Sequence, residues 1–290
     1  MRTVTGFNDY ELIDADNGER LERWGNIILI RPDPQIIWSG ERKNKNWYNA
    51  NAIYHRSQSG GGYWERLSSV PDVWSIDYKG LKFRLKPMGF KHTGLFPEQA
   101  VNWDKAMELI ENSNREISVL NLFAYTGGAT VACLKAGAKV THVDASKGMV
   151  QWAKENAAVS GVADGNVRWL VDDCLKFVKR EIRRGNKYDA IIMDPPSYGR
   201  GPNGEVWKLE QQLAELLTET GKLLSDDALF FFLNSYTGGL SPTILNYMVK
   251  NYVVKGKKGE VTTDEIGLNI TEKGFSLPSG NTTMWISDNG

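Results

Sequence analysis

The sequence predicts an α/β protein with a mostly parallel sheet, preceded by a smaller β-rich domain. From residue 93 onward, short apolar strands alternate with segments of helical periodicity, a pattern typical of parallel sheets whose faces are covered by helices. Residues 1–92 instead hold short alternating pieces bounded by glycine, proline and aspartate, as expected of strands and turns. We therefore expect a β-rich domain over 1–92 and an α/β domain over 93–290.

Composition excludes several classes of protein. The 290 residues carry a formal net charge of +0, so any nucleic-acid site must be a local patch. The two cysteines, Cys133 and Cys174, cannot form a disulfide framework or a zinc site, and we expect no bound metal. No signal-peptide core and no run of ~18 apolar residues is present. We expect a cytoplasmic protein without membrane contact; a homo-oligomer is possible.

The expected elements follow in chain order. In the first domain, a strand within 24–38 is interrupted by Pro32 and Pro34, and further strands lie near 63–67, 72–78 and 81–87. In the second, helices are expected at 97–113, 129–137, 146–161, 174–185, 206–224 and 241–252, with strands at 118–123, 138–144, 167–172, 188–194, 228–236, 259–267 and 282–288. Ser146 should cap the third helix at its start and Gly161 at its end.

The loop after strand 118–123 is unsuited to a dinucleotide. A dinucleotide site needs G-x-G-x-x-G, which lets backbone N–H groups approach a pyrophosphate. Here Ala124, Tyr125 and Thr126 precede adjacent glycines, Gly127 and Gly128, and the bulky tyrosine sits where a pyrophosphate needs clearance. Such a loop can bend around a phosphate-free group such as an amino-acid moiety, although it can also be a simple packing turn.

Acidic residues end the next two strands. Asp144 lies ~20 residues past the loop, where an acid accepts hydrogen bonds from ribose hydroxyls. Asp172 and Asp173 end the third strand and could accept from an adenine amino group, with the Cys174 backbone at the ring edge. Each acid alone is more often a helix cap or a solvated turn. In this order, at successive strand ends, they predict a nucleoside site.

These residues resemble the class I S-adenosylmethionine-dependent methyltransferases. NLFAYTGG, the DD pair, MDPPSY and TGLFPEQ are most similar to the bacterial 23S ribosomal RNA methyltransferase family, which contains cytosine-C5 and guanine-N7 enzymes; the similarity covers about 92–240. The resemblance implies a Rossmann-like seven-stranded sheet, mostly parallel with one antiparallel strand. It also implies S-adenosylmethionine as cofactor, bound by Gln99, Asn121, Phe123, Ala124, Tyr125, Thr126, Gly127, Asp144, Ala145, Ser146, Asp172, Asp173, Cys174 and Asp194.

The candidate catalytic segment follows the fourth strand. In Asp194-Pro195-Pro196-Ser197 two prolines fix the backbone and make a rigid shelf without N–H donors. We expect its carbonyls and the Asp194 carboxylate to point at the place where methyl group and acceptor meet; the alternative is a strand that merely ends in proline. Amino-group methyltransferases with this tetrapeptide usually have an aromatic fourth residue. Ser197, followed by Tyr198, does not support adenine-N6 chemistry.

The sequence lacks the cysteine of the C5 enzymes. Methylation of cytosine C5 needs a thiolate that adds to the ring, and the family places it in a Ser-Cys-Ser-Gly stretch after the fifth strand. The matching stretch here is 235–238, with Tyr236 at the cysteine position. Cys133 is expected in the core and Cys174 on the adenine side. We therefore predict direct in-line transfer to a nitrogen or oxygen, without a covalent intermediate.

Four residues and three basic clusters are candidates for substrate recognition. Ser197, Tyr198, Lys208 and Tyr236 are the candidate substrate-binding residues, and Lys208 could hold a phosphate or be a solvated helix lysine. Basic clusters occur at Arg42, Lys43 and Lys45 beside Trp47 and Tyr48, at Lys82, Arg84, Lys86 and Lys91, and at Lys179, Arg180, Arg183 and Arg184. The first suits the stacking of unpaired bases, or is a small aromatic core with solvated charges.

The leading hypothesis is an S-adenosylmethionine-dependent methyltransferase directed at RNA, ribosomal RNA by resemblance. Alternatives are a methyltransferase of a small molecule or protein, and a cofactor-binding module without turnover. The loop disfavours a nicotinamide oxidoreductase.

Overall fold

The chain folds into two compact units. The computed structural model describes residues 1–57, 61–200 and 206–288. Unit 1 comprises Met1–Arg2, Val101–Ile266 and Pro278–Gly290, and unit 2 comprises Thr3–Ala100 and Gly267–Leu277. The N-terminal unit therefore includes a short segment from near the C-terminus, which the sequence does not indicate.

Unit 1 is built on a mixed sheet. Along it, the strands lie in the order β11 (Val167–Val171), β10 (Lys139–Asp144), β9 (Ser118–Leu122), β12 (Ala190–Met193), β15 (Phe230–Ser235), β17 (Phe275–Ile286) and β16 (Glu260–Ile270). The pairs from β11 to β15 are parallel, and β17 is antiparallel to β15. The predicted mixed α/β sheet is confirmed.

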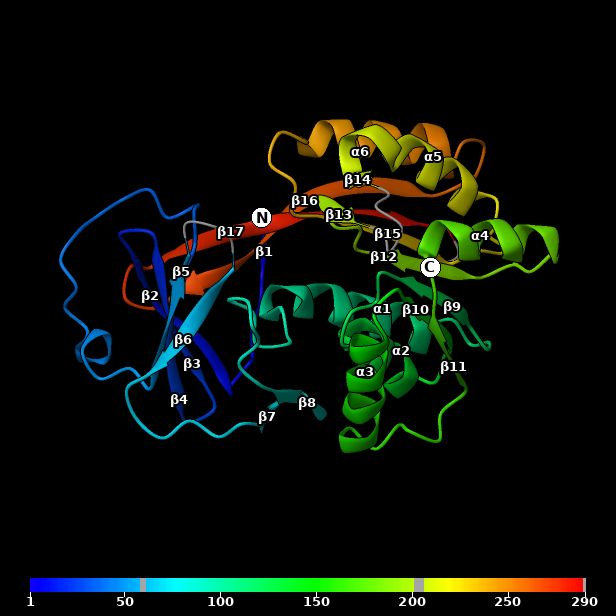
Figure 1. Cartoon of the computed structure of the whole chain (residues 1–290). Helices are drawn as coiled ribbons and strands as arrows, with labels where there is room; N and C mark the ends of the chain where they lie inside the picture. The colour runs from blue at the N-terminus through cyan, green and yellow to red at the C-terminus, as the bar shows by residue number, and fades with distance from the viewer. Residues whose placement is uncertain (58–60, 201–205, 289–290) are drawn as a thin grey trace. The chain divides into compact units, whose positions relative to one another are not determined.

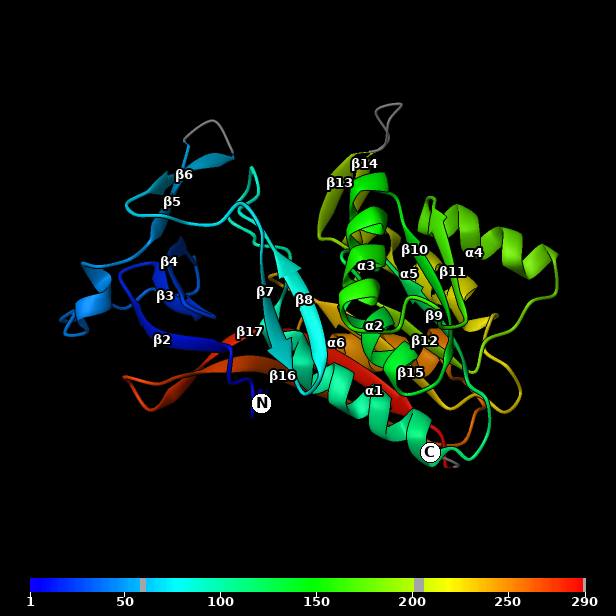
Figure 2. The same cartoon turned by 90° about the horizontal axis from the view of Figure 1, so that it is seen from below.

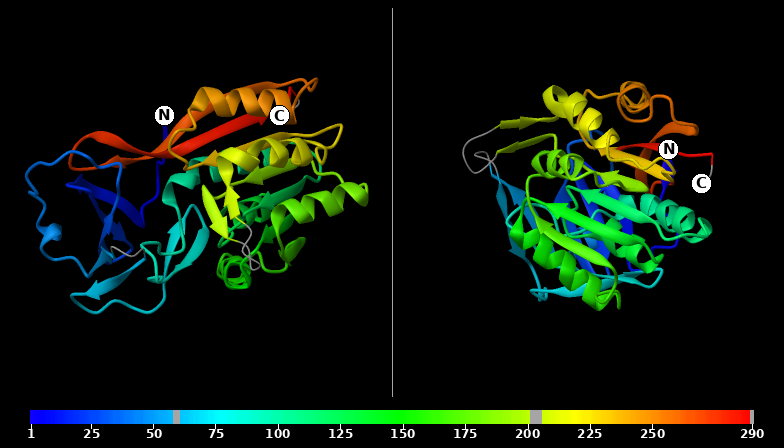
Figure 3. Two further views of the ribbon diagram at one scale, coloured as in Figure 1. Left: turned by 45° about the horizontal axis from the view of Figure 1, so that its top comes forward. Right: turned by 90° about the vertical axis from the view of Figure 1, so that its right-hand side faces the viewer.

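Helices cover both faces of this sheet. They are α1 (Ala100–Asn112), α2 (Gly128–Lys135), α3 (Lys147–Val159), α4 (Cys174–Arg183), α5 (Leu209–Gly221) and α6 (Pro242–Met248), the last continued by a π-helical turn, Val249–Val253. In Figure 1 α4, α5 and α6 lie on one face and α1, α2 and α3 on the other. Figure 2, from below, shows the second set in front of the strands, and Figure 3 repeats the layering from two other sides.

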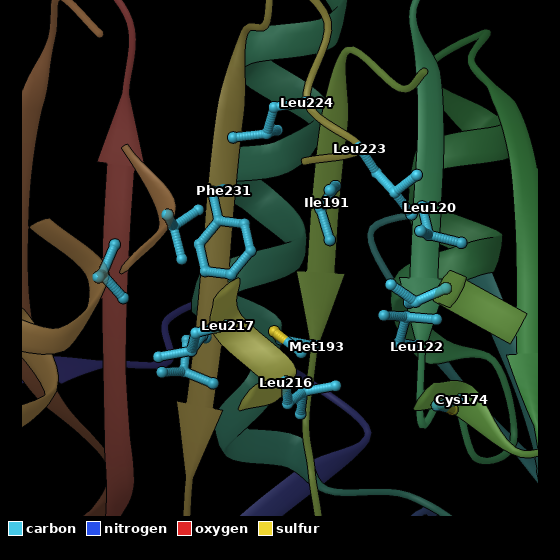
Figure 4. Packing of buried hydrophobic residues seen from close by; sticks show 14 of the residues in the cluster. Leu120, Leu122, Cys174, Ile191, Met193, Leu216, Leu217, Leu223, Leu224 and Phe231 are labelled. Atoms are coloured by element: carbon cyan, nitrogen blue, oxygen red, sulfur yellow. The ribbon is translucent and has the colours of Figure 1, made fainter. Parts of the chain in front are cut away.

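The side chains of each strand alternate between the two layers. Leu120, Ile191 and Phe231 are register partners on β9, β12 and β15, and they are buried with Leu216 and Leu217 of α5 (Figure 4). The strand neighbours Val119, Ala190, Ile192, Phe230 and Phe232 belong to the other cluster, which includes residues of α1 and α2. Because both faces are buried, these strands read as continuous apolar runs.

The predicted caps of α3 are confirmed. The Ser146 side chain accepts from the Met149 N–H at 3.4 Å. Gly161 follows the C-cap Ser160 with a φ of 70°, a conformation that favours glycine.

Unit 2 is β-rich, as predicted. Its main sheet runs β2 (Tyr10–Asp16), β3 (Glu19–Trp24), β4 (Ile27–Pro32), β5 (Ala52–Arg56) and β6 (Gly62–Arg66), with β16 beside β2. A separate ladder pairs β7 (Trp74–Tyr78) with β8 (Leu81–Leu85). Smaller elements are strand β1 (Arg2–Thr3), which pairs with β16, and 3-10 turns at Lys45–Trp47 and Pro97–Gln99. The sequence analysis missed β2, β3 and β5; β2 and β3 carry many charged residues.

In the aromatic and basic cluster, Trp47 and Arg42 are structural, whereas Lys43, Lys45 and Tyr48 are exposed. The Trp47 indole is buried and donates to Asp14 at 2.9 Å. The Arg42 guanidinium lies over the ring, 3.9 Å from its centre, and donates to Glu19 at 2.7 Å. For Arg42 and Trp47, the alternative of a small aromatic core is therefore correct.

Among the described residues, none of the helices has the length and apolar character needed to cross a membrane.

A buried ion pair lies in the core of unit 2. Two nitrogens of Arg31 donate to the two oxygens of Glu22, at 2.6 and 2.7 Å, and the Tyr10 hydroxyl adds a third bond at 2.8 Å. Burial alone would raise the pKa of Glu22, but the charge and hydrogen bonds of Arg31 outweigh it, so the net shift is downward.

Removing one partner of this pair should destabilise unit 2 strongly. Arg31→Met leaves an uncompensated carboxylate in the core, and we expect a loss of about 3–5 kcal/mol in the free energy of unfolding. The double variant Glu22→Leu/Arg31→Met should lose less, because no buried charge remains. Urea unfolding measures both, and equal losses would contradict the expectation.

Candidate active site

The four strand ends predicted to form a site lie side by side in unit 1. The Ala124 N–H donates to the Val143 carbonyl at 3.1 Å, and the Asp172 N–H donates to the Asp144 carbonyl at 3.0 Å. On the other side of β9, the Asp194 N–H reaches the Leu122 carbonyl at 3.4 Å. These backbone bonds join the ends of β11, β10, β9 and β12 into one edge, which we call the carboxyl edge.

The loop at the end of β9 has an unusual backbone. Phe123 and Tyr125 have φ values of 54° and 51°, a left-handed region that non-glycine residues seldom occupy, and Gly127 follows at 83°. Strain of this kind persists only where the surroundings impose it, and it concentrates at functional sites. The loop is therefore a candidate ligand-binding segment on conformational grounds as well.

The two glycines of this loop serve packing. A Cβ on Gly127 would lie 2.8 Å from the Cβ of Ala153, and one on Gly128 would lie 2.7 Å from the ring of Trp103. Their small size lets α3 and α1 approach the loop. The packing turn weighed as the alternative thus accounts for the glycines, whereas the strained positions Phe123 and Tyr125 are not explained by it.

Buried polar side chains lie next to the loop; the sequence analysis named Asn121 but missed Thr130, His142 and Asn156. The Thr130 hydroxyl bonds to the Asn121 amide and to His142 Nδ1, each at 2.9 Å. The Asn156 amide of α3 donates to the Thr126 carbonyl at 2.8 Å. Burial lowers the pKa of His142 to about 3, so its ring is neutral. A polar residue within the buried stripe Val150, Ala153, Ala157 of α3 was the available signal for Asn156.

Asp144 connects the loop with the end of β10. One carboxylate oxygen accepts from the Tyr125 N–H and the other from the Ser146 N–H, both at 2.8 Å. The residue is half-buried, and burial raises its pKa. A carboxylate has about four acceptor positions, so two remain for a ligand diol. Ala145, between Asp144 and Ser146, is exposed.

The acids at the end of β11 already have partners within the protein. Asp172 pairs with Arg180 of α4. Asp173 caps α4, because its side chain accepts from the Lys176 N–H at 2.8 Å. For Asp173 the helix cap that the sequence allowed is thus present.

Cys174 contributes through its side chain. The Phe123 N–H donates to Cys174 Sγ at 3.2 Å, and the thiol is buried. For contact with a ligand, the sequence analysis considers only the backbone of this residue. Cys174 instead holds the first strained position of the loop, linking the loop to the start of α4.

The proline shelf is held by neighbours on two sides. The Trp207 indole donates to the Pro196 carbonyl at 2.6 Å, and the Ser197 hydroxyl bonds to that of Thr237 at 2.6 Å. The Pro196 carbonyl is therefore occupied by a hydrogen bond within the protein. This differs from the expectation that all carbonyls of the shelf point at the atom that receives the methyl group. Asp194, half-buried, and Pro195, buried, remain the shelf groups for chemistry.

Trp207 also contacts the loop at the end of β9. It lies on a strand that the sequence analysis missed. Its ring centre is 5.9 Å from that of Phe123. The predicted helix 206–224 begins only at Leu209, because β14 (Val206–Lys208) pairs antiparallel with β13 (Tyr198–Arg200). This pairing sets the candidate substrate residues Tyr198 and Lys208 opposite each other, both exposed.

Tyr236 is half-buried at the end of β15, and its ring packs on backbone. A Cβ on Gly280 of β17 would lie 2.9 Å from its Cδ1 atom, so glycine makes room for the ring. Beneath it, the Asn102 amide donates to Asn234 at 3.0 Å and to Thr282 at 2.9 Å. Gln99, in contrast, is buried in the turn Pro97–Gln99 of unit 2.

The chain matches a protein family described as S-adenosylmethionine-dependent methyltransferase over residues 50–231. It belongs to that family.

Two ribosomal RNA large subunit methyltransferases K/L are among its relatives. That of Shewanella frigidimarina is 33% identical over 180 residues, covering 61% of this chain and 24% of the relative. That of Pseudoalteromonas atlantica is 32% identical over 249 residues, covering 79% and 34%. The methyltransferase chain thus spans about a quarter to a third of the length of these relatives.

Solved structures agree with this assignment. The crystal structure of the SAM dependent methyltransferase from Agrobacterium tumefaciens is 35% identical, with a TM-score of 0.93 over 98% of this chain and 92% of that one. The structure of SMU.776 complexed with SAH has a TM-score of 0.77 at 18% identity, covering 97% and 76%, and supports the fold alone.

The carboxyl edge fits the family's cofactor, S-adenosylmethionine. Asp144 keeps acceptor positions for a ribose diol, and the loop offers no run of N–H groups to a phosphate, since Tyr125 N–H is bound to Asp144 and Ala124 N–H to Val143. A nucleoside without phosphate suits both observations.

Loss of the Cys174 sulfur should loosen the loop. Cys174→Ala leaves the Phe123 N–H without its acceptor, which costs about 1–3 kcal/mol, so we expect its hydrogen-exchange protection to fall about 10-fold or more. Cys174→Ser supplies a hydroxyl acceptor and should restore most of it. Cys133→Ala, a second buried thiol, is the control; equal loss of Phe123 protection there would contradict the role of Cys174.

Proposed function

We propose that this protein methylates RNA, by direct transfer from S-adenosylmethionine to a nitrogen or oxygen atom and without a cysteine nucleophile. The observation that carries the mechanism is the state of its two thiols. Burial raises the pKa of Cys133 to about 12 and that of Cys174 further, so neither is a thiolate at neutral pH. Tyr236 stands where the C5 enzymes carry their cysteine.

The cofactor site in this proposal is the carboxyl edge. Asp144 accepts the ribose hydroxyls, the Phe123–Gly127 loop receives the amino-acid moiety, and Asp172 with the start of α4 borders the adenine. Supporting this assignment are the strained loop, the hydrogen bond that Asn156 gives to it, and the two acceptor positions left on Asp144. When bound, S-adenosylmethionine supplies an electrophilic methyl group.

The acceptor site in this proposal is formed by the shelf and the β13–β14 hairpin. The shelf offers only acceptor groups, the Asp194 carboxylate and the Pro195 carbonyl, because proline has no N–H. Such groups orient an acceptor atom that carries a hydrogen, by accepting its hydrogen bond. Tyr198 and Lys208 lie opposite each other on the hairpin, where a ring can stack on a base and an ammonium can hold a phosphate.

RNA as the substrate class rests on the relatives. The ribosomal RNA large subunit methyltransferases K/L resemble this chain over up to 79% of its length. The net charge of the protein is +0, which is compatible with RNA binding at a local site.

Transfer of labelled methyl groups from S-adenosylmethionine tests the substrate class directly. The purified protein is incubated separately with total RNA, with a small-molecule extract and with protein from the same cells. We expect label in RNA. Label confined to another fraction would reject the RNA assignment, and absence of label with intact cofactor binding would indicate a module without turnover.

A cysteine-free variant tests the mechanism. For Cys133→Ala/Cys174→Ser we expect kcat within about 3-fold of the wild type, since loss of a required nucleophile lowers kcat by several orders of magnitude. Serine at 174 preserves the acceptor for the Phe123 N–H. A loss of that larger size, in a variant that still binds cofactor, would overturn direct transfer.

Asp144→Asn should weaken cofactor binding about 10- to 100-fold, because hydrogen bonds to a charged acceptor contribute about 1.5–3 kcal/mol. Burial raises the pKa of Asp144, so acidification should weaken binding at a higher pH than for an ordinary aspartate. Asn cannot titrate, and the pH dependence should disappear. Calorimetry measures both effects, with the exposed Asp164→Asn as control; unchanged affinity of the Asp144 variant would remove this residue from the site.

A further inference from the structure

Trp207 contacts both halves of the candidate active site. Its indole N–H donates to the Pro196 carbonyl of the shelf at 2.6 Å. The centre of its ring lies 5.9 Å from that of Phe123, and the two ring planes are inclined at 44°. Phe123 is the first strained position of the loop after β9, with a φ of 54°. One side chain therefore connects the segment assigned to the acceptor with the segment assigned to the cofactor.

The β13–β14 hairpin directs Trp207 to these two segments. Side chains alternate along a strand, so Trp207 and Lys208 point to opposite faces of the hairpin. Tyr198 is the register partner of Lys208 and shares its face, where both are exposed. Gly199 is the register partner of Trp207. The hairpin thus has an outer face with candidate substrate-binding residues and an inner face with Trp207.

Each segment that Trp207 contacts also has a support of its own. In the loop, the Phe123 N–H donates to Cys174 Sγ at 3.2 Å. At the shelf, the Ser197 hydroxyl bonds to that of Thr237 at 2.6 Å. Loss of the Trp207 side chain should therefore alter the spacing between the two segments, while each segment keeps its own conformation.

We propose that Trp207 is a positioning residue for methyl transfer, which sets the spacing between the acceptor atom on the shelf and the methyl group held by the loop. The proposal rests on the proposed function and adds the residue that fixes its two sites relative to each other. In-line transfer needs the reacting atoms about 3–3.5 Å apart, and a misplacement of about 1 Å can cost ~100-fold in rate. A side chain in contact with both segments acts directly on that spacing.

The two contacts of Trp207 act on different steps. The indole N–H holds the shelf, and through it the rate of transfer. The ring packs on Phe123, and through it supports the loop that receives the cofactor; ring pairs at this separation are stabilising beyond the area that they bury. Trp207→Phe removes the N–H and keeps a ring, whereas Trp207→Leu removes both. The two substitutions therefore separate the two contacts.

Trp64 of β6 provides a matched control for a role in packing alone. Its indole likewise donates to a carbonyl, that of Met88, at 2.9 Å, and its ring centre lies 5.4 Å from that of Tyr54. Trp64→Phe and Trp64→Leu thus remove the same two kinds of contact from residues that the proposed function does not use. Thermal unfolding of the full chain establishes that each of the four variants is folded.

The test measures kcat at saturating cofactor and acceptor, KM for the acceptor, and the Kd of S-adenosylmethionine by calorimetry. For Trp207→Phe we expect kcat to fall about 10-fold or more with Kd within about 2-fold of the wild type. For Trp207→Leu we expect kcat to fall about 100-fold and Kd to rise about 3- to 10-fold, because the ring contact with Phe123 is lost. The Trp64 variants should keep kcat and Kd within about 2-fold.

An unchanged kcat in Trp207→Phe would overturn the proposal, as would an equal fall of kcat in Trp64→Phe. A rise in KM with unchanged kcat would also overturn it, because that result indicates a contact that serves substrate binding alone. If Trp207→Leu fails to fold, the kcat of Trp207→Phe decides the question.

The acceptor in these assays is whichever fraction takes up label in the test of the substrate class. Methylation of RNA with kcat unchanged in Trp207→Phe would reject the inference and keep the proposed function. Label in protein or small molecules, with kcat lowered in Trp207→Phe, would reject RNA as the substrate and keep the positioning role. Absence of label from every fraction would reject both.

Discussion

The carboxylate of Asp144 joins the two chain segments on which the carboxyl edge depends. It accepts one N–H from the loop after β9 and one from the start of α3, both at 2.8 Å. The loop could not keep Phe123 and Tyr125 at positive φ without such external restraints. Asn156 of α3 and Cys174 of α4 supply the others. A ligand that uses Asp144 therefore meets a loop already fixed in shape, which limits the entropy lost on binding.

Much of the fold could be predicted because both sheet faces in unit 1 are buried. Continuous apolar runs such as AIIM and FFFL mark parallel strands directly, and the caps Ser146 and Gly161 follow from local chemistry. Strands β2 and β3 were missed because their charges are neutralised by distant partners. Glu22 and Arg31 look solvent-exposed in the sequence and are buried together in the structure.

In the candidate site, some residues could be predicted from the sequence and others could not. Residues at strand ends, such as Asp144 and Asp194, were predictable because parallel strands bring their carboxyl ends to one edge. Supporting residues were not, since Trp207, Thr237 and Asn156 act through contacts far along the chain. Trp207 was also hidden by periodicity, because residues 206–208 fit the helical pattern of α5 but pair with β13 instead. The role of the Cys174 side chain was missed for the same reason, because its partner Phe123 is distant in the sequence.

Strands β16 and β17 begin in one unit and end in the other, with the turn between them assigned to unit 2. A polypeptide ending at Ala100 would therefore lack Gly267–Leu277, including Ile270, the residue that pairs with Leu12 of β2. During synthesis on the ribosome, the main sheet of unit 2 cannot gain this neighbour until residues 267–277 have been made. The two units are thus not consecutive segments of the chain. A single cut cannot separate them, because β16 and β17 each contribute residues to both.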